Sequence, residues 1–237
     1  IWLLKYKIKQ NDKVITICGN RPEWNIIDMA VQQTGAIHVP LYPTYNKDDL
    51  KLILEKCIPS FVFISGMTMY AIVSNILSQI SPDTIIIIID SNNQILSFSN
   101  ILNESYTNDD LKELENIKDN ISTEDYNTIT FSSGSGGQPN GALFKHKACI
   151  SCVTSLAPLL GLSSNDSAIS YLPVSHAYER YHNYSYQILG VSIYYAESVA
   201  TVIDNLAEVK PHFFCTVPLL LERTYNTLIE KFGTFEK

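Results

Sequence analysis

The stretch Ser132-Ser133-Gly134-Ser135-Gly136-Gly137-Gln138-Pro139-Asn140-Gly141 is the most informative part of this chain. It combines four glycines with three serines, and it directly follows the β-type run Thr128-Ile129-Thr130-Phe131. Glycines let the backbone approach a ligand closely, and serine hydroxyls and free backbone N–H groups donate hydrogen bonds. A hydrophobic core gains little from such a segment, so the composition indicates a loop that binds phosphate groups.

The common phosphate-loop templates do not fit this stretch. Gly136 and Gly141 have the spacing of G-x-x-x-x-G-K-[S/T], but Ala142 and Leu143 follow them. Pro139 stands where G-x-G-x-x-G needs its third glycine, and the stretch contains no G-x-S-x-G. A P-loop hydrolase is therefore disfavoured. The loop is short and lies between two predicted strands, so it differs from a flexible linker. The remaining interpretation is a phosphate-binding loop of another type.

Short apolar strands alternate with helical patterns on both sides of this loop. The helices are expected over Pro22–Thr34, Lys47–Cys57, Met67–Ile80, Lys147–Leu160, Ala177–Leu189, Val202–Val209 and Pro218–Phe232, the first of them capped by Asn20. This alternation predicts the α/β class, with mostly parallel sheets flanked by helices. Ligands bind beyond the carboxyl ends of such strands, and the Gly/Ser loop follows a strand.

The Gly/Ser loop resembles the signature loop of the adenylate-forming (AMP-binding) superfamily, whose pattern runs Tyr-Thr-Ser-Gly-Thr-Thr-Gly-x-Pro-Lys-Gly. Gly136 replaces a hydroxyl residue of that pattern, and Asn140 replaces its lysine. The resemblance implies that the loop holds the phosphates of ATP. Its nucleotide-binding residues would be Ser132, Ser133, Gly134, Ser135, Gly136, Gly137, Gln138, Pro139, Asn140 and Gly141. Lys145 or Lys147 is a hypothetical substitute for the missing cation.

A second motif, Leu172-Pro-Val-Ser-His-Ala-Tyr-Glu-Arg180, resembles the Leu-Pro-x-x-His-x-x-Glu-Arg segment of long-chain fatty acyl-CoA synthetases. The resemblance implies that His176 is a catalytic, active-site residue and that Glu179 neighbours it on one helix face. A lone histidine is more often structural. This one follows a strand and a proline turn at the edge where such sheets bind ligands, which favours the functional interpretation.

The resemblance covers nearly the whole chain and implies that residues 1–237 form part of the large N-terminal domain of an adenylate-forming enzyme. Residues 1–127 would be a first α/β portion with an acidic, polar loop at 91–127, and residues 128–237 would carry the phosphate loop. The C-terminal domain is expected to be absent from this stretch, so the piece alone is expected to be inactive.

By the same resemblance, the full-length protein is a ligase that converts a long-chain fatty acid to an acyl-adenylate and then to acyl-CoA. ATP, Mg²⁺ and coenzyme A would take part, and fatty acid and ATP would be the partners. The alternative is an impaired homologue with a nucleotide-binding or scaffolding role. Asn140 and Gly136 favour this alternative, while His176, Glu179 and the serines favour the enzyme.

The composition of the chain limits which partners, metals and cellular compartments we expect for the protein. The net charge is -7, which argues against nucleic acid as a partner. Five cysteines form no disulfide framework, and the single C-x-x-C of Cys149 and Cys152 lacks the second pair that zinc needs, so no protein-held metal is expected. A reducing compartment follows, either the cytoplasm or the cytoplasmic face of a membrane. Peripheral membrane association of the full-length protein stays open.

Overall fold

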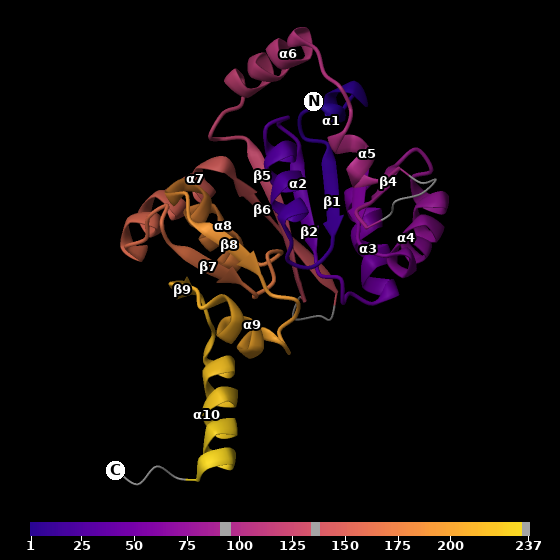
Figure 1. Cartoon of the computed structure of the whole chain (residues 1–237). Helices are drawn as coiled ribbons and strands as arrows, with labels where there is room; N and C mark the ends of the chain where they lie inside the picture. Colours follow the sequence, from indigo (N-terminus) through magenta and orange to yellow (C-terminus); the bar gives the residue numbers. More distant parts are fainter. Residues whose placement is uncertain (91–95, 134–137, 234–237) are drawn as a thin grey trace.

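The computed structural model describes residues 1–90, 96–133 and 138–233, which fold into two sheets flanked by helices (Figure 1). The first sheet has the strand order β4-β3-β1-β2-β5-β6. All its pairings are parallel except the antiparallel hairpin of β5 and β6. Its strands are β1 Lys13–Ile17, β2 Ile37–Leu41, β3 Phe61–Ile64, β4 Ile85–Ile88, β5 Tyr126–Ser133 and β6 Pro139–Lys145.

Helices cover both faces of the first sheet because alternate strand residues point to opposite sides. Val14 on β1 packs on one side against Trp24, Ile27 and Val31 of α2 (Pro22–Gln32). Its neighbour Ile15 packs on the other side with α3 (Lys47–Cys57) and α4 (Met67–Ile80). Strands buried on both faces read as continuous apolar runs, as they do here.

The second sheet is smaller and wholly parallel, in the order β8-β7-β9. Its strands are β7 Ser167–Ser170, β8 Ser192–Tyr195 and β9 Phe213–Phe214. The helices of this part are α7 His146–Leu156, followed by the 3-10 turn Ala157–Leu160, then α8 Ala177–Leu189, α9 Val202–Val209 and α10 Pro218–Phe232. In Figure 1, α10 extends away from the body of the molecule.

Three further helices complete the described part of the chain: α1 Trp2–Lys5, α5 Phe98–Leu102 and α6 Asn108–Asp119. A reciprocal capping box between Thr107 and Asp110 begins α6, in the polar segment where the sequence predicts a loop with a helix near Asp109–Ile117. Within the described ranges, no helix combines the length and the apolar character needed to cross a membrane.

The predicted class, α/β with mostly parallel sheets, is confirmed, and α3, α4, α8, α9 and α10 have the predicted bounds. The hairpin of β5 and β6 was not predicted, because apolar patterning does not reveal whether neighbouring strands run parallel. Residues 128–237 therefore contribute two strands to the first sheet before the second sheet begins.

The predicted capping role of Asn20 is wrong. Arg21 is the N-cap residue of α2, and no side chain bonds to that helix end. The amide of Asn20 instead donates to Ser170 Oγ at 2.9 Å and to Leu172 O at 2.7 Å, and its oxygen accepts from Val174 N at 3.1 Å. Asn20 follows β1 and the other three residues end or follow β7, so these bonds join the carboxyl ends of the two sheets.

Candidate functional site

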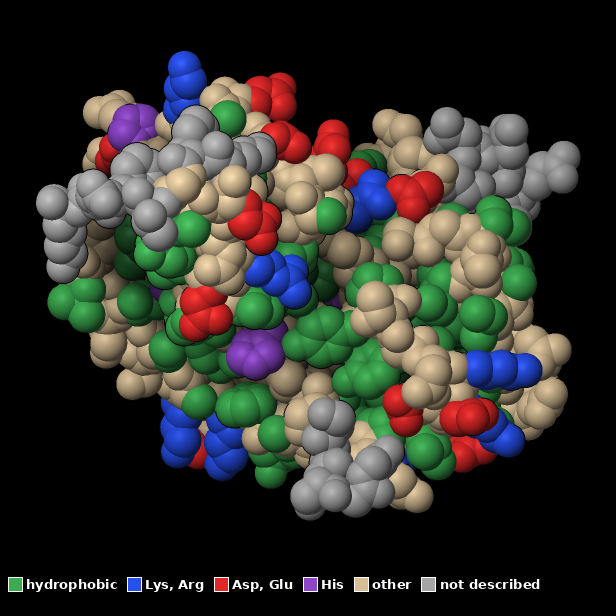
Figure 2. All heavy atoms as spheres, turned by 90° about the horizontal axis from the view of Figure 1, so that it is seen from below, with side chains coloured by type: hydrophobic (Ala, Val, Ile, Leu, Met, Phe, Trp, Pro, Cys, Tyr) green, Lys and Arg blue, Asp and Glu red, His purple; other side chains and the backbone are tan. Residues whose placement is uncertain are grey.

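A pocket of about 510 Å³ lies where the carboxyl ends of the two sheets meet. Tyr42 follows β2, the segment from Leu172 to Glu179 follows β7, and the segment from Thr216 to Pro218 follows β9. Ligands of parallel α/β sheets bind at this edge. In the view from below, apolar side chains gather across the middle of the corresponding face (Figure 2).

His176 lines this pocket and is also the N-cap residue of α8. Its Nδ1 accepts a hydrogen bond from the backbone N–H of Tyr178 at 3.3 Å, and its side chain is exposed. Strand β7 ends at Ser170, and Pro173 with the turn that follows it leads into α8. Because Nδ1 accepts this bond, the neutral tautomer of His176 has its proton on Nε2, an atom that makes no hydrogen bond to the residues described here.

Glu179 lines the same pocket one helical turn further on, and only 1% of its surface is exposed. Its Oε1 accepts from Asn183 Nδ2 at 3.1 Å, while Oε2 is buried and has no hydrogen-bond partner among the described residues. Burial raises the pKa of Glu179 to about 7, although the nearby Ser170 hydroxyl and the hydrogen bond from Asn183 act in the opposite direction. A carboxyl group with this pKa exchanges a proton near neutral pH.

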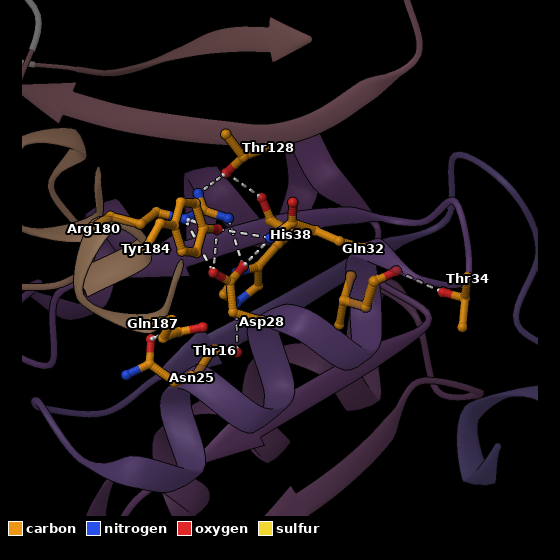
Figure 3. A network of polar contacts seen from close by, with 11 residues as sticks. Thr16, Asn25, Asp28, Gln32, Thr34, His38, Thr128, Arg180, Tyr184 and Gln187 are labelled. Atoms are coloured by element: carbon orange, nitrogen blue, oxygen red, sulfur yellow. Dashed lines mark hydrogen bonds and ion pairs between the residues drawn. The ribbon is translucent and has the colours of Figure 1, made fainter. Parts of the chain in front are cut away.

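A buried ion pair fixes α8 against the first sheet (Figure 3). Arg180 Nη2 lies 2.5 Å from Asp28 Oδ1, and both side chains are at most 2% exposed. Arg180 also donates to Thr128 Oγ1 at 2.6 Å and to the Tyr184 hydroxyl at 2.8 Å. The residue therefore connects α8 with α2 and with β5.

His38 completes this network from β2. Its Nδ1 lies 2.6 Å from Asp28 Oδ1, and its Nε2 lies 2.8 Å from Thr16 Oγ1. Burial would raise the pKa of Asp28, but the nearby charge of Arg180 and the contact with His38 hold it below its usual value. Burial lowers the pKa of His38 despite Asp28. The pair is thus Asp28 anion with Arg180 cation, and His38 is a neutral bridge.

The Gly/Ser loop connects β5 to β6 at the same edge of the first sheet. Ser132 and Asn140 are exposed and pair across the two strands, while Gly134, Ser135, Gly136 and Gly137 lie outside the described residues. Gln138 is exposed where the description resumes. Tyr45, three residues after the pocket residue Tyr42, donates from its hydroxyl to Phe131 O at 3.3 Å. The Tyr42–Tyr45 segment therefore lies against both the pocket and the base of the hairpin.

Two residues of the loop motif have packing roles in the hairpin. Pro139 is buried, and its carbonyl accepts from Lys56 Nζ at 2.9 Å. A Cβ at Gly141 would lie 2.8 Å from Ile129 Cγ2 and 3.1 Å from Phe131 Cζ, so only glycine fits without movement. Part of this motif is therefore explained by strand packing, independently of any ligand.

Lys145 and Lys147 do not reach the loop. Lys145 ends β6 opposite Tyr126, six residues from Pro139, which corresponds to about 20 Å along a strand. Both ammonium groups bind Glu124, at 3.0 Å and 2.7 Å. The hypothesis that one of them replaces the missing loop lysine is therefore wrong in geometric terms, because β6 runs away from the site.

Several residues around the site were not predicted from the sequence to belong to it. Tyr42 and Thr216 line the pocket, although each lies far along the chain from His176. Asp28 and Arg180 are buried charges, and the only signal in the sequence was an acid on the apolar face of an amphipathic helix. His176 and Glu179 were predicted to share a helix face, and the structure brings both to one pocket.

Two parallel-rich sheets that share a pocket, with a Gly/Ser hairpin at the same edge, form the architecture of the N-terminal domain of adenylate-forming enzymes. The family model described as "AMP-binding enzyme" matches residues 2–234, so the chain belongs to this family, whose members use ATP. A protein of Rhodopseudomonas palustris assigned as a long-chain-fatty-acid CoA ligase has the same fold, with a TM-score of 0.78 and 19% identity over 95% of this chain and 55% of that one.

Curated relatives point to one branch of the family. Long chain acyl-CoA synthetase 6 of Arabidopsis thaliana is 28% identical over 91% of this chain and 32% of its own length. Long-chain-fatty-acid–CoA ligase 5 of Mus musculus is 28% identical over 93% of this chain and 34% of its own length. The chain is thus similar to long-chain acyl-CoA synthetases, and it spans about a third of the length of these relatives.

Proposed function

We propose that the full-length protein activates a long-chain fatty acid with ATP, forming an acyl-adenylate and then an acyl-CoA. One observation carries the proposal: His176 and Glu179 line a pocket of about 510 Å³ at the edge of the sheets where the Gly/Ser hairpin also ends. The pocket combines apolar lining residues with two polar residues, His176 and Glu179, and such a lining suits an acid with an apolar body.

The proposed reaction has two steps, and different parts of the site would serve them. A carboxylate oxygen attacks the α-phosphate of ATP, and pyrophosphate leaves; the thiolate of coenzyme A later displaces AMP. Ser132 and Ser133, with the backbone N–H groups of the loop, would hold the phosphates, and Mg²⁺ bound with ATP would neutralise the charge that develops on pyrophosphate. The protein itself mainly positions the reactants. We place the reaction in the cytoplasm or at the cytoplasmic face of a membrane.

The alternative is a homologue that binds nucleotide weakly and serves as a scaffold. Asn140 favours it, because an amide offers the phosphates a donor without a positive charge. The geometry adds to this point, since Lys145 and Lys147 are held at the other end of β6.

Fatty-acid-dependent exchange of labelled pyrophosphate into ATP, measured on the full-length protein, separates the two functions. Exchange in the wild type, with strong loss in His176→Asn, supports the enzyme. Absence of exchange that is restored by Asn140→Lys identifies a degenerate enzyme. Absence of exchange in both proteins overturns the proposed activity.

A further inference from the structure

Glu179 presents an unusual combination of burial and missing partners. The side chain is 1% exposed, it lines the pocket, and its Oε2 has no hydrogen-bond partner among the described residues. A buried polar atom without a partner costs free energy comparable to a lost hydrogen bond. An occupant of the pocket that bonds to Oε2 would remove this cost.

The surrounding hydrogen bonds decide which oxygen of Glu179 carries a proton. Asn25 Nδ2 donates to Asn183 Oδ1 at 3.2 Å, so the amide nitrogen of Asn183 faces Glu179 and donates to Oε1. Oε1 is therefore an acceptor. In the neutral acid the proton resides on Oε2, and the Glu179 carboxyl group can then donate a hydrogen bond from this oxygen.

The other groups near Glu179 do not neutralise it by charge. The pocket has no lysine or arginine among its described lining residues. Arg180, the next residue, is bonded to Asp28 in the network between α8 and α2. The remaining titratable groups that face Glu179 from α8, from the ends of β7 and β8 and from the segment after β9 are His176, Tyr178, Tyr186, Tyr171, Tyr195 and Cys215.

We propose that Glu179 binds the substrate in its protonated form and donates a hydrogen bond from Oε2 to an oxygen of the substrate carboxylate. This inference rests on the proposed fatty-acid activation, and it adds that one proton is taken up when the acid binds above neutral pH. The reason is electrostatic: because the described lining of the pocket holds no lysine or arginine, two adjacent carboxylates there repel each other strongly, and they share one proton. The pKa of Glu179, about 7, makes that proton available near neutrality.

The matched variants are Glu179→Gln and Glu179→Ala. Glutamine keeps an oxygen for Asn183 and places an N–H₂ donor where Oε2 stood, but it does not titrate. Alanine removes the donor. Glu197→Gln, an exposed acid after β8, is the control for a general loss of negative charge.

The experiment measures decanoate binding to the full-length protein by titration calorimetry, without ATP, at about pH 6 and about pH 8. Decanoate is a carboxylate that stays ionised and soluble across this range. We expect wild-type affinity to fall about tenfold between the two pH values, as a pKa of about 7 requires. We expect Glu179→Gln to bind equally at both, Glu179→Ala to bind about tenfold more weakly than wild type at the lower pH, and Glu197→Gln to behave as wild type.

Buffers of different ionisation enthalpy report proton uptake, which a purely structural role would not alter. We expect close to one proton per decanoate bound at about pH 8 in the wild type and none in Glu179→Gln. A pH-independent wild-type affinity, a glutamine variant as weak as the alanine variant, or no decanoate binding by the wild type overturns the proposal.

Pyrophosphate exchange on the same preparations separates this inference from the proposed function. Exchange without the pH effect refutes the role of Glu179 alone. The pH effect without exchange supports the role of Glu179 and refutes the activation reaction.

Discussion

Glu179 and Arg180 are adjacent on α8, and both are buried, yet their side chains have opposite environments. Arg180 contacts Asp28 at 2.5 Å and is bonded on several sides, whereas Glu179 lines the pocket with one oxygen unpartnered among the described residues. Consecutive helix residues point about 100° apart, which lets one helix turn serve the core with one side chain and the pocket with the next. The pocket acid is thereby held on a helix whose position the ion pair fixes.

Removal of Arg180 should destabilise the fold strongly. In Arg180→Leu, Asp28 would remain buried without its charged partner, and such losses cost about 3–5 kcal/mol of unfolding free energy. Urea denaturation of the full-length protein measures the change. The double variant Asp28→Leu with Arg180→Leu should regain much of the loss. The control Arg21→Leu breaks a partly exposed pair with Asp90, for which about 1 kcal/mol or less is expected.

The unfolding free energy should depend on pH through Glu179. Its pKa is about 7 in the folded protein and 4.5 in the reference state, so the folded chain binds the proton more tightly. The contribution of Glu179 to stability is therefore largest below about pH 4.5, and it falls as pH rises to about 7, by roughly 3 kcal/mol in total. Glu179→Gln should lose this decline, which denaturation at several pH values detects. An identical pH slope in both proteins would contradict the raised pKa.

Substitution of His176 should separate its capping role from its chemical role. Asparagine is a good N-cap residue and keeps the acceptor for Tyr178 N–H, whereas alanine removes it. We expect His176→Asn to keep wild-type stability and His176→Ala to lose about 1 kcal/mol. Both should lose at least about a hundredfold in pyrophosphate exchange if the imidazole acts on the substrate. Full exchange in the asparagine variant would assign His176 to capping alone.

Asn140→Lys should strengthen ATP binding. A lysine contact with phosphate is charge-assisted and contributes about 1.5–3 kcal/mol, which corresponds to about tenfold to a hundredfold in affinity. Asn140 is exposed on β6, so the new side chain meets little steric resistance. Asn120→Lys, at the exposed end of α6, controls for added charge. Equal ATP affinity in Asn140→Lys and wild type would mean that this position does not contact the phosphates.

The lysines of β6 and α7 should not contribute to the affinity of the protein for ATP. The double variant Lys145→Ala with Lys147→Ala is expected to keep wild-type ATP affinity, because both side chains bind Glu124 at the far end of β6. Lys56→Met removes the bond to Pro139 O beside the loop, and a loss of about fivefold is expected, the equivalent of about 1 kcal/mol. A larger loss in the double variant than in Lys56→Met would contradict this geometry.

The class of fold and the position of the loop are predictable from local patterns of residues. Runs such as Ile85–Ile88 and helical patterns such as Lys47–Cys57 are local signals, because strand and helix periodicity are properties of neighbouring residues. The Gly/Ser stretch and the Leu-Pro-x-x-His-x-x-Glu-Arg motif were equally local. They located His176 and Glu179 before any tertiary contact was known.

The contacts that these residues make depend on how distant segments pack, which local patterns do not reveal. Asn20 joins the two sheets where local rules predicted a helix cap, and Lys145 is held away from the loop by the direction of β6. The ion pair of Asp28 with Arg180 joins segments 152 residues apart, and Glu179 lies in a pocket that segments following three different strands line. Local sequence carries no record of such distances, and the charge of a carboxyl group depends on its burial and on the charged partners that packing brings to it. The chain thus encodes where its acid lies, while packing determines whether that acid holds a proton.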